Sequence, residues 1–184
     1  LMRCSWVDLK DKEYVAYHDT EWGVPVHNER TLFEMLILEG FQAGLSWQCV
    51  LHKRENFRFA FDNFDVKKVA SYNEEKINQL MKNKGLIRHK LKIVGAIKNA
   101  KVFLEIQKEF GSFDAYIWHW TKGKIIQANG AQTRSVLSDK ISKDLKKRGM
   151  GFVGSTIIYA YLCAIGIINA HEKQCDLKRR KNAL

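Results

Sequence analysis

An all-α fold in a single domain is what this sequence predicts. Only one proline occurs in 184 residues, few stretches alternate apolar and polar residues as strands do, and several repeat apolar residues at helical spacing. Hydrophobic residues make up 46% of the chain and aromatic residues 11%, which is enough for the core of one domain. We expect the helical domain to span residues 1–176. Residues 177–184 are expected to form a basic tail, whose order we leave open.

The first helix is expected to follow a loop-rich segment. Residues 1–25 bring several aromatic side chains together and end in the turn sequence Gly-Val-Pro. Asn28 is a typical N-cap, and apolar side chains at helical spacing continue from it to Glu39. The sequence therefore predicts a helix that begins after Asn28 and ends at Glu39.

Two glycines and a serine shape the stretch that follows. Gly40 and Gly44 interrupt the helical pattern, and Ser46 can cap a new helix that runs from Trp47 to Phe61. A carboxylate before such a turn and an indole after it suit a small pocket for a flat, electron-poor ring. An ordinary helix–helix turn, with a surface glutamate and a core tryptophan, is the alternative.

Further helices are expected in the rest of the chain, each marked by an apolar periodicity and a capping residue or a terminating glycine. Ser71 and Glu74 have the spacing of a capping box, Ser138 is a candidate N-cap, and Gly111 follows the longest amphipathic stretch. Residues 121–135 are interpreted as a connection. The expected helices cover residues 65–70, 73–82, 91–110, 113–120 and 138–148, with an apolar helix from residue 155 onward.

The segment 138–166 has the order of a helix-hairpin-helix: a basic helix, a glycine-rich turn and an apolar helix. Glycines let backbone N–H groups approach an anion closely, and the following helix presents its positive end. Phosphate groups of DNA would suit such a turn, although a plain pair of antiparallel helices would explain the same glycines. The residues expected to contact DNA here are Lys146, Lys147, Arg148, Gly149, Gly151 and Gly154.

The charge of the chain favours a polyanionic partner. Lysine and arginine number 31 against 20 aspartates and glutamates, which gives a formal net charge of +11. Nucleic acid is the preferred interpretation, and an anionic membrane surface is the weaker one. Solvated helix faces would also account for several of the basic clusters.

Cysteine and histidine residues near the two chain ends form a candidate metal site. Cys4 and His18 lie near one end, whereas His171 and Cys175, spaced i and i+4, would share one face of a helix. Two thiolates and two imidazoles suit tetrahedral zinc, and four protein ligands leave no open position for catalysis. The spacing is not that of a standard zinc knuckle, so four unrelated residues remain an alternative.

The sequence is expected to belong to an intracellular protein. Its first residues lack a secretory pattern, and its longest apolar run is too short to span a bilayer. Four cysteines without framework spacing indicate a reducing compartment rather than disulfides. We expect a cytoplasmic protein without a membrane partner.

Taken together, these features resemble the 3-methyladenine DNA glycosylase I family. The resemblance extends over nearly the whole chain, and the stretch from Glu39 to Trp47 is its most specific part. The segments that carry it are residues 3–6, 17–23, 38–47 and 145–154.

The resemblance implies a helical member of the helix-hairpin-helix DNA glycosylase superfamily, with its chain ends joined by one structural zinc ion. It implies that Glu39 and Tyr17 contact the edge of the base and that Trp47 stacks on its face. The remaining roles implied are a cavity wall from Trp6 and Trp22, a wedge beside the extruded nucleotide from Gly44 and Leu45, and zinc ligands from Cys4, His18, His171 and Cys175.

The function implied is monofunctional excision of 3-methyladenine from double-stranded DNA with alkylated purines, which leaves an abasic site. Many superfamily relatives carry an aspartate just beyond the hairpin's second helix, where this chain has Asn169, and bifunctional ones add a lysine in the hairpin. Residues 149–154 contain no lysine, so we expect no lyase activity. Neutral lesions should be poor substrates. We also expect a monomer that associates with the nucleoid through DNA.

Two other readings compete with this one. Phe41 stands where the family is expected to have a polar residue, and the connection after Trp120 is shorter than expected. Of these two departures, only Phe41 favours a non-enzymatic, zinc-stabilised helical protein that recognises damaged DNA. The second alternative is a zinc-stabilised interaction domain whose charge serves only solubility.

Overall fold

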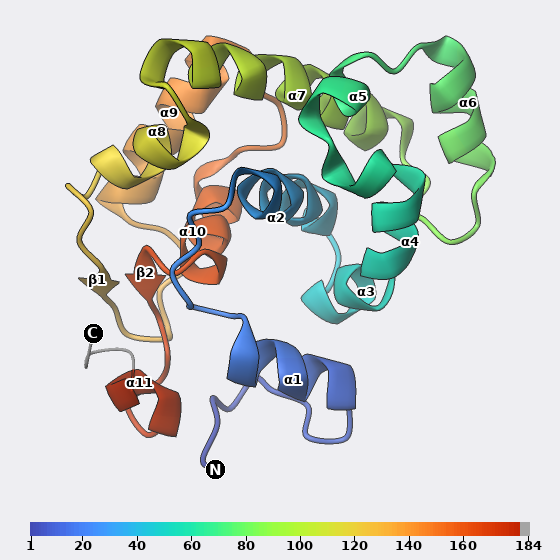
Figure 1. Cartoon of the computed structure of the whole chain (residues 1–184). Coiled ribbons are helices and arrows are strands. Elements are labelled where there is room, and N and C mark those ends of the chain that lie inside the picture. Colours follow the sequence, from blue (N-terminus) through green and yellow to red (C-terminus); the bar gives the residue numbers. More distant parts are fainter. Residues whose placement is uncertain (181–184) are drawn as a thin grey trace.

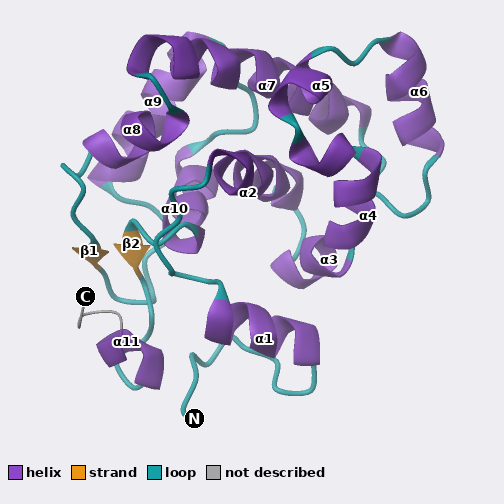
Figure 2. Ribbon diagram, in the orientation of Figure 1, coloured by secondary structure: helices purple, strands orange, loops and turns teal. Residues whose placement is uncertain are grey.

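The computed structural model describes residues 1–180, and almost all of its regular structure is helical (Figures 1 and 2), as predicted. Two short strands pair in parallel, with Ile126 opposite Ile168. In chain order the elements are α1 (Lys12–Thr20), α2 (Glu29–Gln42), α3 (Trp47–His52), α4 (Arg54–Ala60), the 3-10 turn η1 (Asp62–Phe64), α5 (Val66–Ala70), α6 (Glu74–Lys82), α7 (Lys90–Phe110), α8 (Phe113–His119), β1 (Ile126–Gln127), α9 (Val136–Arg148), α10 (Ser155–Ala164), β2 (Ile168–Asn169) and α11 (Asp176–Arg180).

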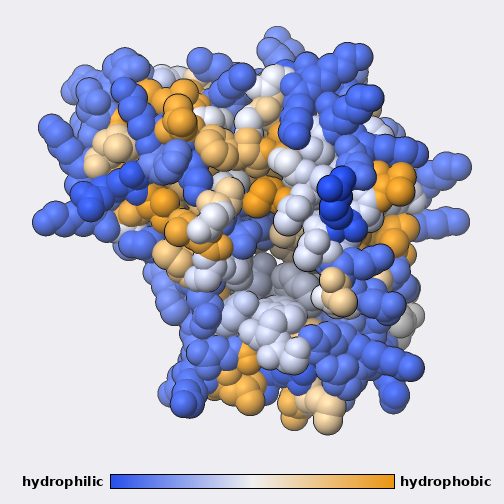
Figure 3. All heavy atoms as spheres, turned by 180° about the vertical axis from the view of Figure 1, so that it is seen from behind, coloured by the Kyte–Doolittle hydropathy of each residue, from blue (hydrophilic) through white to orange (hydrophobic). Residues whose placement is uncertain are grey.

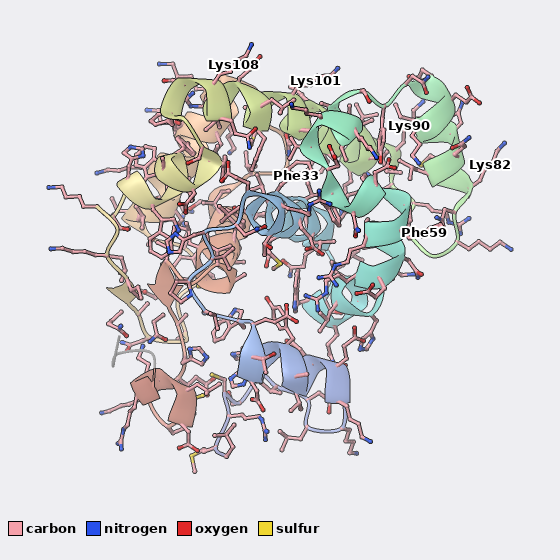
Figure 4. All side chains as sticks on the ribbon, in the orientation of Figure 1. Phe33, Phe59, Lys82, Lys90, Lys101 and Lys108 are labelled. Carbon is pink, nitrogen blue, oxygen red and sulfur yellow. The ribbon has the colours of Figure 1, made fainter. Side chains whose placement is uncertain are left out.

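Helix α2 lies at the centre of the molecule, and it packs against α3, α7, α8 and α10 (Figure 1). Every residue from Leu32 to Phe41 is buried, and Figure 4 shows Phe33 inside the ring of surrounding helices. A helix covered on all sides must bury its polar residues too. It buries two carboxylates: Glu34 accepts a hydrogen bond from Arg58, whereas Glu39 faces a cavity.

Helix α1 is an element that the sequence analysis missed, and its residues were expected to belong to a loop-rich segment. The side chain of Asp11 caps it by accepting from the Tyr14 N–H at 3.1 Å. Its sequence has no regular apolar stripe, so helical periodicity does not reveal it. Only its aromatic side is buried, where Tyr17 and His18 face the body of the protein.

The predicted boundaries around the central glycines were wrong in two places. Helix α2 continues through Gly40 to Gln42, where Gly40 packs against Phe152: a Cβ added at Gly40 would lie in ordinary van der Waals contact, 3.5 Å from the Cβ of Phe152. The helix expected from residue 47 to residue 61 is instead α3 and α4, separated by Lys53.

Two predicted caps also move. Helix α6 is capped by Asn73, whose side chain accepts from the Lys76 N–H, rather than by a box from Ser71. The N-cap of helix α9 lies three residues earlier than expected, at Ser135, and Ser138 is the second member of a capping box. The cap of α7 at Gly111, with φ of 85°, is as predicted.

The two chain ends meet. The Asp176 N–H donates to the Met2 carbonyl at 2.9 Å, and the Asp176 carboxylate accepts from the Met2 N–H at 2.8 Å. The expected tail is therefore ordered at its start, where it forms α11 and buries Leu177 beside Cys4. Residues 181–184 lie outside the described part. None of the described helices combines the length and the apolar character needed to cross a membrane.

Candidate active site

A cavity of about 300 Å³ opens between α1, the end of α2 and α10. The space-filling view from behind shows the surface hollowed near the middle of the molecule (Figure 3). A volume of this size is at the lower end for small-ligand pockets and suits a single ring system. All five residues that the sequence analysis assigned to base binding or catalysis line it: Trp6, Tyr17, Trp22, Glu39 and Trp47.

Glu39 is the acidic group of this cavity. It lies in the last turn of α2, is 4% exposed, and was expected to leave the end of its helix. Burial raises the pKa of its carboxyl group to about 8, and no charged or hydrogen-bonding neighbour among the described residues offsets this shift. A cation in the cavity would supply the missing partner. The site is therefore suited to a positively charged ligand.

The raised pKa of Glu39 predicts how stability depends on pH. Between the ordinary pKa of 4.5 and about 8, the folded state binds more protons at this group than the unfolded state. The free energy of unfolding therefore falls as pH rises through that window, by roughly 4–5 kcal/mol in total. Glu39→Gln should be more stable than wild type at pH 9 and lose that advantage near pH 4, measured by urea denaturation.

The matched control for this prediction is Glu34→Gln on the same helix. Glu34 is also buried, but Arg58 pairs with it. Its replacement should destabilise the protein at pH 9 because Arg58 loses its buried carboxylate partner and keeps only the exposed Glu55. Equal stability of wild type and Glu39→Gln at pH 9 would contradict the unpaired burial of Glu39.

Aromatic rings form two sides of the cavity. Tyr17 and Trp47 are tilted by 41° with centroids 5.3 Å apart, and Trp6 meets Trp22 edge to face at 4.8 Å. Burial, with the nearby charge of Glu39, holds the pKa of Tyr17 well above 10, so its hydroxyl stays protonated and can donate. The buried Nε1–H of Trp47 has no acceptor within the described chain.

The opposite wall was missed by the sequence analysis. It comes from α10 and from residues 130–133, a segment that had been interpreted only as a connection. Helix α10 is apolar on nearly all sides, so its pattern does not show that one strip borders a cavity. The helical spacing of that strip is the signal that was available. The residues of α10 that line the cavity are Thr156, Tyr159, Ala160 and Cys163. Other segments contribute Gln132, Thr133, Tyr14 and Gln42.

Residues 43–46, here called the 43–46 turn, connect α2 to α3 next to the cavity. Gly44 adopts φ of 79°, a left-handed conformation that favours glycine. The Leu45 N–H donates to the Gln42 carbonyl at 2.8 Å, and the side chain of Leu45 is 40% exposed. The role of Leu45 as a wedge stays a prediction.

Residues 149–154, here called the hairpin, join α9 to α10 as expected. Two glycine N–H groups that were predicted to approach a phosphate donate to protein acceptors instead: that of Gly149 to the Lys146 carbonyl, and that of Gly151 to the Asn99 side chain. Their N–H groups are engaged inside the protein, so these glycines serve the shape of the hairpin. The N–H groups of residues 152–154 donate to no residue in the described range, and helix α10 has no side-chain cap.

The predicted basic residues beside the hairpin fall into two groups. Lys146 and Lys147 are exposed at the end of α9. Arg148 donates to Asp144 and Glu109, at 2.8 and 2.6 Å, so its charge is compensated inside the protein. The assignment of Arg148 to DNA binding stays a prediction, for a side chain that already has two carboxylate partners.

Three of the four predicted metal ligands come together. The candidate ligand atoms of Cys4, His18 and Cys175 all lie within 4.8 Å of one another, and all three residues are buried. His171 is the neighbour of this group, with its ring centroid 5.4 Å from that of His18. The helical face predicted for His171 and Cys175 is wrong, because both residues lie in the turn before α11.

Hydrogen bonds fix the orientation of both imidazoles. His18 Nδ1 lies 2.9 Å from Asp19 Oδ1, and His171 Nδ1 lies 2.9 Å from Asn169 Oδ1. Asn169 was expected to occupy the position of a catalytic aspartate, yet its side-chain oxygen is directed to His171. Partners of this kind on Nδ1 are typical of histidines that bind a metal through Nε2.

Phe41 has no part in the cavity. It is 1% exposed and packs edge to face on Phe57, with centroids 4.8 Å apart. The departure from the expected polar residue is thus a matter of core packing. It gives no support to the non-enzymatic alternative.

The fold and the site together define a class: a basic helical protein with a buried carboxylate and aromatic walls around a cavity for one flat ring. The chain belongs to the methyladenine glycosylase family, whose model matches residues 6–179.

Relatives and solved structures agree with this assignment. DNA-3-methyladenine glycosylase 1 of Escherichia coli is 44% identical over 178 residues, covering 94% of this chain and 95% of that protein. The enzyme of Haemophilus influenzae is 42% identical over 181 residues, covering 96% and 97%. A tyrosine-to-phenylalanine variant of 3-methyladenine DNA glycosylase I, solved in complex with 3-methyladenine, has a TM-score of 0.92 at 32% identity, covering 97% and 98%.

Proposed function

We propose that this protein is a DNA glycosylase that excises 3-methyladenine from double-stranded DNA and leaves an abasic site. The observation that carries the proposal is the placement of Glu39 and Trp47 on one cavity of single-base size. The relatives named for this activity, at 42–44% identity, support it. Release of free 3-methyladenine from methylated duplex DNA, measured by chromatography, is its test.

The chemistry follows from the charge on the lesion. Methylation at N3 makes the attached adenine cationic, so the electrons of the glycosidic bond can leave with a base that becomes neutral. The nucleotide must first leave the stack, because its sugar carbon is otherwise unreachable. Water then adds to that carbon as the bond breaks, and the proton of the water is released. A neutral lesion lacks the labile bond and should be a poor substrate.

The cavity residues bind and orient the base. Trp47 stacks on the cationic ring, a contact worth on the order of 0.5–2 kcal/mol. The base's positive charge stabilises the ionised form of Glu39, which then accepts N–H groups from the purine edge. Tyr17 donates its hydroxyl hydrogen to an acceptor on that edge. Binding of the cation thus replaces the proton that Glu39 holds in the free protein at neutral pH.

Trp47→Leu is expected to weaken binding of protonated 3-methyladenine by roughly 3- to 30-fold, because the cation–π contact is lost while the cavity stays apolar. Isothermal titration near pH 5 measures the affinity. Trp120→Leu is the control, since Trp120 is also partly buried but lies outside the cavity. Equal losses in both variants would remove stacking from the site.

DNA is proposed to lie across the hairpin and the 43–46 turn. The N–H groups of residues 152–154 and the start of α10 suit a phosphate, as in helix-hairpin-helix motifs. Lys146 and Lys147 add positive charge beside them. Leu45 would enter the gap left by the extruded nucleotide.

A structural zinc ion on Cys4, His18, Cys175 and His171 is part of the proposal. The donor chemistry fits: two thiols and two imidazoles, buried, with the far nitrogens of the imidazoles already held. Bound zinc would supply no chemistry to the base. It would tie the N-terminal segment to the turn before α11, and so hold Trp6 and α1 against the cavity.

The remaining expectations extend the same proposal. The hairpin carries no lysine, so borohydride should trap no covalent complex with DNA. We propose a monomer that acts in the cytoplasm at the nucleoid. With Phe41 in the core, the non-enzymatic alternative has lost the feature that favoured it.

A further inference from the structure

Helix α7 carries two buried polar side chains that bind the backbone of other segments. The first is Lys92, 7% exposed, whose Nζ donates to the carbonyl oxygens of Phe41 and Ala43 at 3.0 and 2.5 Å. These carbonyls lie at the end of α2, where C=O groups lack partners within the helix and a cation is favoured. Lys92 therefore fastens the start of the 43–46 turn to α7.

The second buried side chain is Asn99, which is 4% exposed. Its Nδ2 donates to the Gly151 carbonyl at 2.9 Å, and its Oδ1 accepts from the Gly151 N–H at 2.9 Å. One carboxamide thus satisfies both backbone groups of a residue in the hairpin. No hydrogen bond of this kind would form if the hairpin moved by an ångström.

The two attachment points share one face of α7. Residues 92 and 99 are seven apart, so they lie two turns from each other, about 10 Å along the axis. Between them Gly95 leaves room for Phe152 of the hairpin: a Cβ at Gly95 would lie 2.8 Å from that ring. Phe152 also borders Gly40 of α2, so the hairpin, α2 and α7 meet there.

We propose that Lys92 and Asn99 are positioning residues that hold the 43–46 turn and the hairpin at a fixed separation, so that both engage one DNA duplex at once. The inference rests on the proposed function, in which the hairpin binds phosphates and Leu45 fills the gap. Neither side chain lines the cavity, so both act through other residues. A fixed separation removes the cost of ordering two loops during base extrusion.

Lys92→Met and Asn99→Ala test the proposal in the full chain. Release of 3-methyladenine from methylated duplex should fall about 10- to 100-fold in kcat/KM, because a displaced loop misaligns the extruded nucleotide. The affinity for free 3-methyladenine should stay unchanged, since the cavity is intact. Amide hydrogen exchange should accelerate in the 43–46 turn for the first variant and in the hairpin for the second.

The controls are two residues with similar side chains elsewhere. Lys101→Met removes an exposed lysine of α7, which points outward in Figure 4. Asn56→Ala removes another side chain that holds a backbone carbonyl, that of Gly85 at 3.2 Å. Both should leave duplex turnover and free-base affinity as in wild type.

Two results would overturn the inference: unchanged turnover and exchange in both variants, or a loss of free-base affinity parallel to the loss of turnover. If Asn99→Ala fails to fold, Lys92→Met decides alone, because methionine keeps the aliphatic volume. If wild type releases no base, the proposed function fails. Exchange and duplex binding then still decide whether Lys92 and Asn99 hold the two loops.

Discussion

Glu39→Gln is expected to lower 3-methyladenine release from methylated DNA by about 100-fold, although the variant folds and is more stable at pH 9. The neutral amide keeps the volume of the side chain but loses the charge that opposes the cationic base. Charge-assisted hydrogen bonds of this kind contribute roughly 1.5–3 kcal/mol each. Because the amide oxygen can still accept weaker, neutral hydrogen bonds from the purine edge, the expected net loss is about 2.7 kcal/mol, which corresponds to about 100-fold in rate.

The measurement is kcat/KM for base release at pH 7.5 with wild type, Glu39→Gln and Glu34→Gln. The last variant removes a buried carboxylate that Arg58 pairs and that lies outside the cavity. It should lose stability and keep its activity below its unfolding temperature. At Glu39 the substitution thus lowers activity and raises stability, whereas at Glu34 it lowers stability alone, as expected if only Glu39 is a functional group buried without a partner. Wild-type release by Glu39→Gln would exclude Glu39 from the mechanism.

Loss of the proposed zinc ion is expected to have the largest effect on stability. Wild type purified without chelators should contain one zinc per chain, and Cys4→Ser should contain none. Structural zinc sites contribute folding energy directly. A loss of about 5 kcal/mol would lower Tm by roughly 10–20 °C in a chain of this length.

Metal analysis and thermal unfolding of the same samples measure this. Cys49→Ser is the matched control, because Cys49 is partly buried and lies outside the described cluster of candidate ligands. It should keep its zinc and most of its Tm. A chain that carries no metal, and whose Tm a chelator leaves unchanged, would contradict the proposed site.

The sequence was enough to predict the main residues of the cavity, but it did not predict the burial of Glu39. Resemblance placed Glu39 and Trp47 in one site, and the coordinates bring both to the same cavity. The burial that raises the pKa of Glu39 was not predictable, because α2 is covered by helices such as α10 that are distant in the sequence. Periodicity within one helix does not indicate which distant segment will cover it.

The roles of individual glycines were also not predictable from the local sequence. Gly40 and Gly44 look alike in the sequence, yet Gly44 forms a left-handed turn whereas Gly40 lies inside a continuous helix and packs against Phe152. In the hairpin, Gly151 was assigned to DNA because glycine turns suit phosphates. Its N–H is instead bound by Asn99, a residue 52 positions away that no local pattern connects to it.

The most direct measurement is chromatography of the bases released when wild type is incubated with duplex DNA methylated at purine nitrogens. Free 3-methyladenine should appear in the soluble fraction, and DNA that carries hypoxanthine should remain intact under the same conditions. Tight binding of the methylated duplex without release of any base would contradict the assignment of Glu39 and Trp47 to excision. The protein would then be a reader of damaged DNA.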